Sequence, residues 1–130
     1  MNALIGYSGT DGADDSNGKS WAEGGAYRQY LKQSDFQNPA MVYVTLDEQG
    51  DSINDGFFID PLNPTAWGDI PASYHGGACG FSFADGHAEI HKWKSATSRY
   101  LVKYVFYQMN FDAAGLQDYQ WYKDRCGWIR

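Results

Sequence analysis

The sequence predicts a single, β-rich α+β domain over residues 1–130, with an antiparallel sheet, short helices and long ordered loops. A chain of 130 residues is long enough for one hydrophobic core but short for two. Aromatic residues make up 17% of it, and its fifteen glycines favour many turns over long helices. Residues 74–93 also have the pattern of a β-hairpin, around which we expect the sheet to form.

The hairpin is predicted from Asp85 and Gly86, which lie between two short runs of alternating residues. An Asp-Gly pair readily takes the positive φ angles of a two-residue type I′ turn. Because side chains alternate along a strand, this register puts the apolar residues of both runs on one core face. That predicted core face consists of Cys79, Phe81, Phe83, Ala88 and Ile90. The predicted outward face consists of Gly80, Ser82, Ala84, His87, Glu89 and His91.

Before this hairpin, the chain alternates between loops and short elements. Residues 1–25 are rich in Gly, Asp and Ser and predict a loop, in which the EF-hand pattern fails because Ala13 takes the first ligand position. Residues 26–33 predict two helical turns. The apolar, β-branched run 41–46 predicts a strand buried on both faces at the centre of the sheet.

Acidic residues gather directly after that strand, at Asp47, Glu48, Asp51 and Asp55. Carboxylates at a strand end, with Gly and Asn to bend the backbone, are typical ligands for one hard cation, so these four form a candidate calcium site. The alternative is an acidic connection in which Asp and Asn side chains cap their own turns.

The remaining elements surround the hairpin. Residues 60–73 contain three prolines and predict an irregular loop that Trp67 pins to the body of the domain. A strand is predicted over residues 101–109. A terminal helix is predicted from Asp118, with Tyr119, Tyr122 and Cys126 on one face and Gly127 as its stop signal.

Charge excludes one class of partner. The formal net charge is −6 and the pI is about 4.8, and the ten Lys and Arg residues form no basic run, so we expect no nucleic-acid partner. The two cysteines, Cys79 and Cys126, show no C-x-x-C pattern and are either bridged to each other or free.

Catalysis is not expected either. All three histidines lie in the hairpin stretch, but along one strand His87 and His91 are about 13 Å apart at 3.3 Å per residue, too far to share one metal ion. The chain has no nucleophile elbow and no base with an evident orienting group. His75 is instead expected to anchor the Gly76-Gly77 bend through a hydrogen bond.

A family resemblance rests on this same stretch. His75, nine intervening residues and then Asp85-Gly86 resemble the "H-X9-DG" signature of prepilin-type, pseudopilin-like bacterial proteins. Residues 47–58, 69–93 and 118–125 are similar to that family in the same order.

The resemblance implies a non-enzymatic structural or interaction subunit, the globular head of a pseudopilin-like protein from a type II secretion or type IV pilus-like system. His75, Asp85 and Gly86 would be signature residues with a structural role, and no cofactor would be required, with calcium as an optional loop stabiliser. The partners implied are other pilin-like subunits, in a homo- or hetero-oligomer. Family members carry an N-terminal apolar helix that anchors the full-length protein in the inner membrane, so we expect this chain to be the head alone, on the periplasmic or extracellular side of the cell envelope.

The alternative is an extracellular β-rich module that binds carbohydrate or protein. In that case exposed aromatic side chains would stack on the ligand, and the candidates are Trp21, Trp67 and Trp128.

Overall fold

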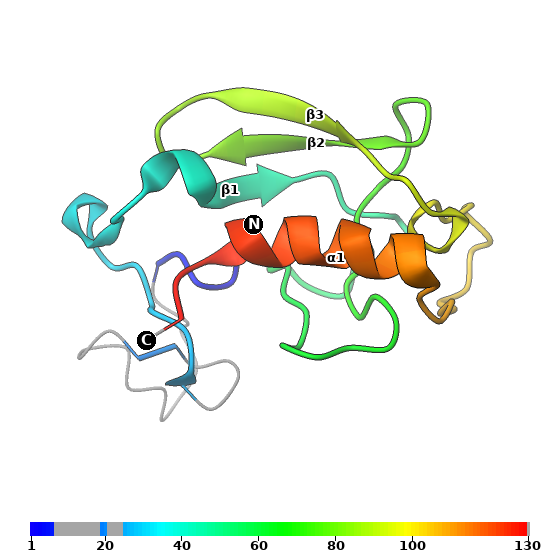
Figure 1. Ribbon diagram of the computed structural model, residues 1–130, viewed down its shortest axis with the longest axis horizontal. Helices are drawn as coiled ribbons and strands as arrows, with labels where there is room; N and C mark the ends of the chain where they lie inside the picture. The colour runs from blue at the N-terminus through cyan, green and yellow to red at the C-terminus, as the bar shows by residue number, and fades with distance from the viewer. Residues whose placement is uncertain (7–18, 21–24, 130) are drawn as a thin grey trace.

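A three-stranded antiparallel sheet and one α-helix form the two regular layers of the domain. The computed structural model describes residues 1–6, 19–20 and 25–129. The strands β1 (Tyr43–Leu46), β2 (Ala78–Phe83) and β3 (Ala88–Lys92) lie in the order β1-β2-β3, and α1 (Ala113–Cys126) runs along one face of the sheet (Figure 1). The described residues also include the 3-10 helices η3 (Gln33–Asp35), η4 (Pro39–Met41) and η5 (Ala96–Ser98). The predicted α+β class is confirmed at this level. Within the described ranges, no helix combines the length and apolar character needed to cross a bilayer.

Trp67 lies at the centre of the core and is fully buried. Its ring packs edge-on against Trp93, Phe111, Tyr119 and Tyr122, with ring centroids 5.4 to 5.7 Å apart. These contacts fix the irregular loop 60–73 to the body of the domain, as predicted, and two of them are with α1.

The helix begins earlier than predicted. Asp112 is its N-cap, and the Asp112 carboxylate accepts a hydrogen bond of 2.7 Å from the Gly115 backbone N–H. Asp118, the predicted start, is buried within the helix and accepts hydrogen bonds from the backbone N–H groups of Lys94 and Ser95. Asp118 therefore does cap backbone N–H groups, but those of the segment after β3 and not those of its own helix. The predicted buried face of Tyr119, Tyr122 and Cys126 is confirmed, as is the end of the helix at Gly127.

The apolar run 41–46 forms a strand from Tyr43 onward, while Met41 belongs to η4, and the predicted central place of the strand is wrong. β1 is an edge of the sheet and β2 is its centre. Only one face of β1 is covered: Tyr43 is fully buried, whereas Thr45 is exposed and shares a hydrogen bond of 2.6 Å with Ser82 on the open face. The chain start lies along the side of β1 that faces away from β2, where the Asn2 backbone N–H donates to the Val44 carbonyl.

The predicted turn length is also wrong, by one residue. The Phe83 N–H donates to the His87 carbonyl and the Gly86 N–H to the Phe83 carbonyl, so the loop is Ala84-Asp85-Gly86. Gly86 takes a φ of +94°, which favours glycine. An Asp-Gly pair serves such a three-residue loop as well as a two-residue turn, which is why the sequence pattern did not separate them.

The longer hairpin loop shifts the pairing by one residue and so reverses the predicted faces of β3. Phe81 pairs with Glu89 and Cys79 with His91, so β2 buries its predicted core residues while β3 does not. Ala88 and Ile90, predicted in the core, lie on the open face, where Ile90 is 69% exposed. His91, predicted to face outward, contacts α1 instead.

Two other predicted elements are absent from the described structure. Residues 26–33 are extended rather than helical: Tyr27 pairs with Ile129 and Tyr30 with Ile5. Backbone partners from both chain ends outweigh the weak propensity for two helical turns. Residues 101–109 form no strand, and their apolar side chains are largely exposed because no neighbouring strand pairs with them.

The start of the chain is only partly the loop that we predicted. Asn2 is buried, and its side-chain amide donates to the carbonyls of Tyr43 and Cys126, which joins β1 to the end of α1. The part tested for an EF-hand and the candidate aromatic residue Trp21 fall outside the described residues.

Candidate functional site

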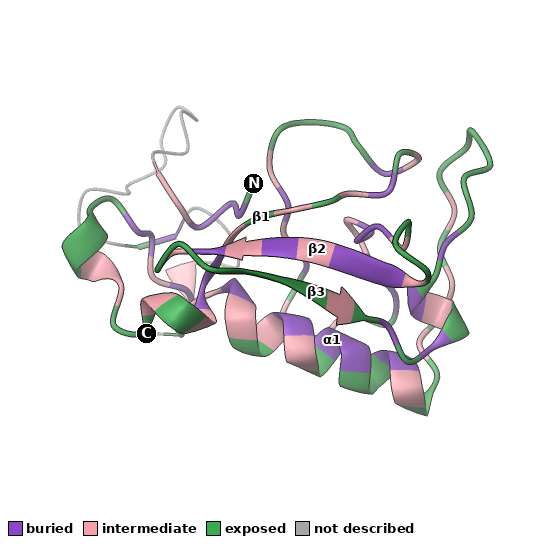
Figure 2. Cartoon of the chain, turned by 90° about the horizontal axis from the view of Figure 1, so that it is seen from above, coloured by how far each residue is buried: buried purple, intermediate pink, exposed green. Residues whose placement is uncertain are grey.

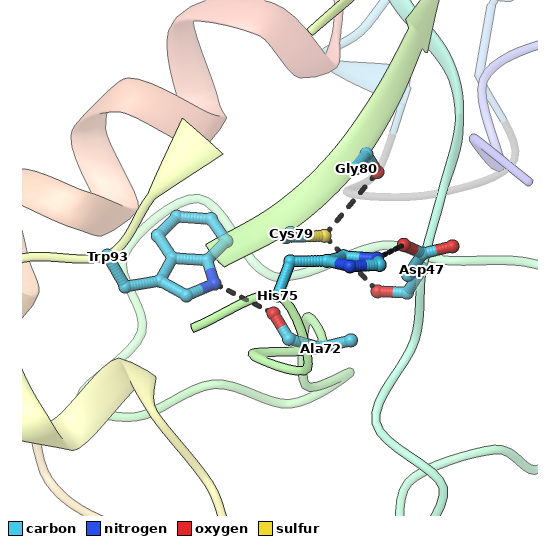
Figure 3. Close-up of polar contacts among 6 residues, drawn as sticks. All are labelled: Asp47, Ala72, His75, Cys79, Gly80 and Trp93. Atoms are coloured by element: carbon cyan, nitrogen blue, oxygen red, sulfur yellow. Dashed lines mark hydrogen bonds and ion pairs between the residues drawn. The ribbon is translucent and has the colours of Figure 1, made fainter. Parts of the chain in front are cut away.

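The signature residue His75 lies at the bend that leads into β2 (Figure 3). Its Nε2 atom is 3.3 Å from Oδ2 of Asp47, which directly follows β1. Its backbone N–H donates to the Ala78 carbonyl, and Gly76 and Gly77 both have positive φ, so the bend needs glycine. The backbone of His75 therefore closes the bend, and its side chain contacts Asp47 at the end of β1.

Asp85 and Gly86 shape the tip of the hairpin. Oδ1 of Asp85 accepts a hydrogen bond from the His87 backbone N–H and lies 2.5 Å from His87 Nδ1. The backbone hydrogen bond and then the side-chain hydrogen bond from His87 lower the pKa of Asp85. The His87 ring stacks on Phe83, with centroids 4.3 Å apart, so both polar side chains of the tip serve the turn.

The third histidine belongs to a different contact. His91 stacks on Trp121 of α1 with ring centroids 3.5 Å apart, and the Arg125 guanidinium lies 4.0 Å from the Trp121 ring centroid. Burial lowers the pKa of His91, which favours the neutral ring. The histidines are thus spread over three separate contacts. Among the residues described, no set of three or more His, Cys, Asp or Glu side chains is arranged to hold a metal ion.

The two cysteines are free and buried. The Cys79 Sγ contacts the Asp47 carbonyl at 3.3 Å (Figure 3), and Cys126 Sγ lies 3.5 Å from the Tyr27 hydroxyl. Burial raises the pKa of Cys79 to about 12 and that of Cys126 to about 11. Both therefore stay thiols at neutral pH, so neither is a ready nucleophile. The two are not joined in a disulfide.

The four residues of the candidate calcium site have separate partners. Asp47 contacts His75, and the Glu48 carboxylate accepts from Ser52 Oγ at 2.9 Å. Asp51 accepts from the backbone of the 101–106 segment, and Asp55 accepts from the Phe57 backbone N–H at 2.7 Å. Of the four, only Asp55 caps its own turn, as in the alternative, whereas Asp51 accepts from a distant segment and Glu48 from a serine hydroxyl. Calcium binding at these residues stays a prediction.

A buried carboxylate at Asp60 was not found from the sequence. Asp60 is 3% exposed; its Oδ1 accepts from the Gly68 N–H, while its buried Oδ2 has no hydrogen-bond partner within the described structure. Burial raises the pKa of Asp60 well above the usual Asp range, and the neighbouring Asp69 adds to the shift. Asp60 therefore tends to be protonated in the folded state.

We expect Asp60→Asn to flatten the pH dependence of stability. A carboxyl with a raised folded-state pKa binds more protons folded than unfolded, so the free energy of unfolding falls as pH rises above about 4 toward the raised pKa. The asparagine keeps the acceptor for Gly68 but cannot ionise, so the variant should be the more stable protein at pH 7. Urea unfolding from about pH 4 to pH 8 measures this, with Asp124→Asn, an exposed change on α1, as the control. Equal slopes in Asp60→Asn and the wild type would contradict it.

The open face of the sheet carries a groove of about 510 Å³. It is opposite to the face that contacts α1, and Figure 2 shows no other described element lying over it. Small residues along β2 leave space in the groove. A Cβ at Gly80 would meet the Asp47 carboxylate at 3.0 Å, so glycine leaves room for that carboxylate. Its lining residues are Thr45, Leu46, Asp47, Gly80, Phe81, Ser82, Ala88, Glu89 and Ile90.

A second exposed surface was also missed because the sequence predicted a strand there. Residues 101–106, here called the apolar loop, expose all five of their large apolar side chains. These are Leu101, Val102, Tyr104, Val105 and Phe106, of which Tyr104 is 95% exposed. Patches of this kind are uncommon on soluble monomers unless they bind something.

Asp51 holds the apolar loop in place. Its carboxylate accepts hydrogen bonds of 2.6 Å and 2.9 Å from the backbone N–H groups of Lys103 and Tyr104. Tyr104 has a φ of +60°, a costly conformation for tyrosine that these hydrogen bonds stabilise. The Tyr107 hydroxyl closes the base of the loop by donating to the Leu101 carbonyl at 2.8 Å.

We expect Asp51→Ala to release the apolar loop without unfolding the domain. The Lys103 and Tyr104 amides lose their acceptor, so their hydrogen exchange should accelerate by at least tenfold while exchange in β2 stays unchanged. Asp51→Asn keeps one acceptor oxygen and should give an intermediate rate. Unchanged exchange at both amides in Asp51→Ala would show that Asp51 does not hold the loop.

Of the three candidate carbohydrate-stacking residues, Trp67 is excluded by its complete burial. Trp128 is 46% exposed and lines a hollow of about 350 Å³ together with Arg28, Asp35 and Gln37. Trp21 lies outside the described residues.

Comparison with known proteins adds no relative: no family model, no curated protein and no solved structure matches the chain.

Proposed function

We propose that this chain is the globular head of a pseudopilin-like subunit from a type II secretion or type IV pilus-like system. Its role is structural rather than enzymatic: it assembles with other pilin-like subunits at the bacterial cell envelope, on the periplasmic or extracellular side. In the full-length protein an N-terminal apolar helix supplies the anchor in the inner membrane.

The observation that carries this proposal is that the three segments resembling the family pack against one another. Asp47 of the first contacts His75 of the second. Phe58 of the first packs on Tyr122 of the third, with ring centroids 5.7 Å apart. Asp118 of the third accepts from Ser95, close behind the second segment. Segments that build one core together are expected to occur together in the proteins of one family.

The signature residues support the same role. The His75 side chain contacts Asp47 after β1, and Asp85 and Gly86 form a turn, so each residue of the motif has a structural contact or conformation that needs no chemistry. A head domain needs those contacts to present its surface in a fixed shape.

Processing by a prepilin peptidase tests the proposal. In bacteria that express the whole gene, the protein should fractionate with the inner membrane, and deletion of the prepilin peptidase should leave a larger, uncleaved form on an immunoblot. A known pilin-like subunit of the same cell serves as the positive control. The same size in both strains, or a protein found only in the cytoplasm, would contradict the proposal.

A further inference from the structure

We propose that the apolar loop of one molecule docks into the open-face groove of a second copy of this chain. This inference rests on the assembly role proposed above and names the two surfaces through which heads meet. The loop is residues 101–106, and the groove is lined by β1, β2 and β3.

The loop has the properties of a preformed contact. Its apolar side chains are exposed although Asp51 and Tyr107 fix its backbone, so binding them costs little further ordering. Tyr104 and Phe106 are aromatic, and an aromatic side chain buries about 150–250 Å² when it is covered. A strained, hydrogen-bonded tip that presents such side chains to water is best accounted for by a partner surface.

The groove offers a matching surface on the same chain. Ala88 and Ile90 give it an apolar edge, and Gly80 and Ser82 leave space along β2. At about 510 Å³ it has room for aromatic side chains of the loop. Ile90 is exposed in the single molecule, so docking would cover apolar area on both partners.

Charge favours a second copy as the occupant. The loop carries Lys103, which is exposed, and the groove is lined by Asp47, whose carboxylate lies beside Gly80. A cation on the loop would thus meet an anion at the groove, which favours one orientation and offsets part of the repulsion between molecules of net charge −6.

The contact is head-to-tail. Figure 1 shows the segment between β3 and α1, coloured gold, at one end of the molecule, whereas the groove lies on the face of the sheet. The two surfaces have no residue in common, so each molecule keeps one free loop and one free groove after docking. Such heterologous contacts build open chains unless they close into a ring. The contact is small, so we expect association to be weak.

Sedimentation velocity of the purified chain over a range of concentrations tests the proposal. The loop variant is Tyr104→Ser with Phe106→Ser, the groove variant is Ala88→Arg, and the control is Leu116→Ser, which removes a 52% exposed apolar side chain from α1. The wild type and the control should form species larger than a dimer as concentration rises. Each of the other two variants should need at least tenfold higher concentration, with unchanged melting temperatures showing that they are folded.

Mixing the two variants gives the decisive result. The groove variant still has an intact loop and the loop variant an intact groove, so an equimolar mixture should form dimers and nothing larger. A wild type that stays monomeric at all concentrations, or association unaffected by either variant, would overturn the proposal. The proposal would also be overturned if the groove variant self-associated like the wild type but no longer bound an added apolar helical peptide. In that case the groove would be a site for a helix and not for the apolar loop. None of these outcomes changes the result of the peptidase test of the proposed function. Self-association can likewise be measured if the peptidase test fails.

Discussion

Replacing Trp67 by alanine is expected to lower the free energy of unfolding by about 3–5 kcal/mol. The indole is fully buried and contacts four aromatic rings, two of them on α1. Its Nε1–H also donates to Ser98 Oγ at 3.2 Å, which would lose its partner. The variant leaves a cavity between the irregular loop and the helix, where rigid rings on all sides limit collapse.

Chemical denaturation of Trp67→Ala measures this loss, and Trp128→Ala is the matched control. Trp128 is half exposed, and its backbone carbonyl, which accepts from the Arg28 N–H, is unaffected by the substitution. The control should therefore lose no more than about 1 kcal/mol. Similar losses in the two variants would mean that Trp67 does not organise the core.

Asp118→Ala should lower the free energy of unfolding by about 3 kcal/mol, because it leaves buried backbone donors without an acceptor. The Asp118 carboxylate accepts from the Lys94 N–H at 2.9 Å and from the Ser95 N–H at 2.9 Å, and the residue is 1% exposed. These bonds join the chain that leaves β3 to the middle of α1.

Two further variants separate the effect of Asp118 from a general effect on the helix. Asp118→Asn keeps one acceptor oxygen and should lose less than the alanine variant. Asp124→Ala changes an exposed residue of the same helix and should lie within about 0.5 kcal/mol of the wild type. Equal losses of unfolding free energy in Asp118→Ala and Asp124→Ala would show that the hydrogen bonds to Asp118 do not stabilise the fold.

The elements that the sequence predicted well depend on local chemistry. Asp85-Gly86 marked the hairpin, Trp67 marked the pinned loop, and Gly127 marked the end of the helix. Asp85-Gly86 and Gly127 act through local backbone requirements. Trp67 was predictable because so large an apolar side chain is usually buried, although its ring partners are distant in sequence.

The elements that it predicted wrongly depend on partners far away in sequence. Residues 26–33 are extended because Tyr27 pairs with Ile129, and no local pattern contains that pairing. The faces of β3 reversed because turns of two and three residues share the Asp-Gly pair. Residues 101–109 have the composition of a strand, but no described strand lies beside them to complete a ladder.

The candidate site was predictable in part for the same reason. The signature residues could be named because they follow one another along the chain, and the acidic residues because they cluster within it. The pairing of His75 with Asp47, the buried carboxylate of Asp60 and the exposed apolar loop arise only from the fold. Each joins segments that are distant in sequence or concerns exposure, which a linear pattern does not record.

Photo-crosslinking in living cells tests the assembly role most directly. A photoreactive amino acid replaces Tyr104 on the apolar loop of the full-length protein, and Gln120, an exposed residue of α1, carries the same group as the control. After illumination, mass spectrometry of the crosslinked products should identify pilin-like subunits, including further copies of this chain, at a higher yield from position 104. Crosslinks from position 104 that contain no pilin-like subunit would contradict the assignment of this chain as a pseudopilin-like head.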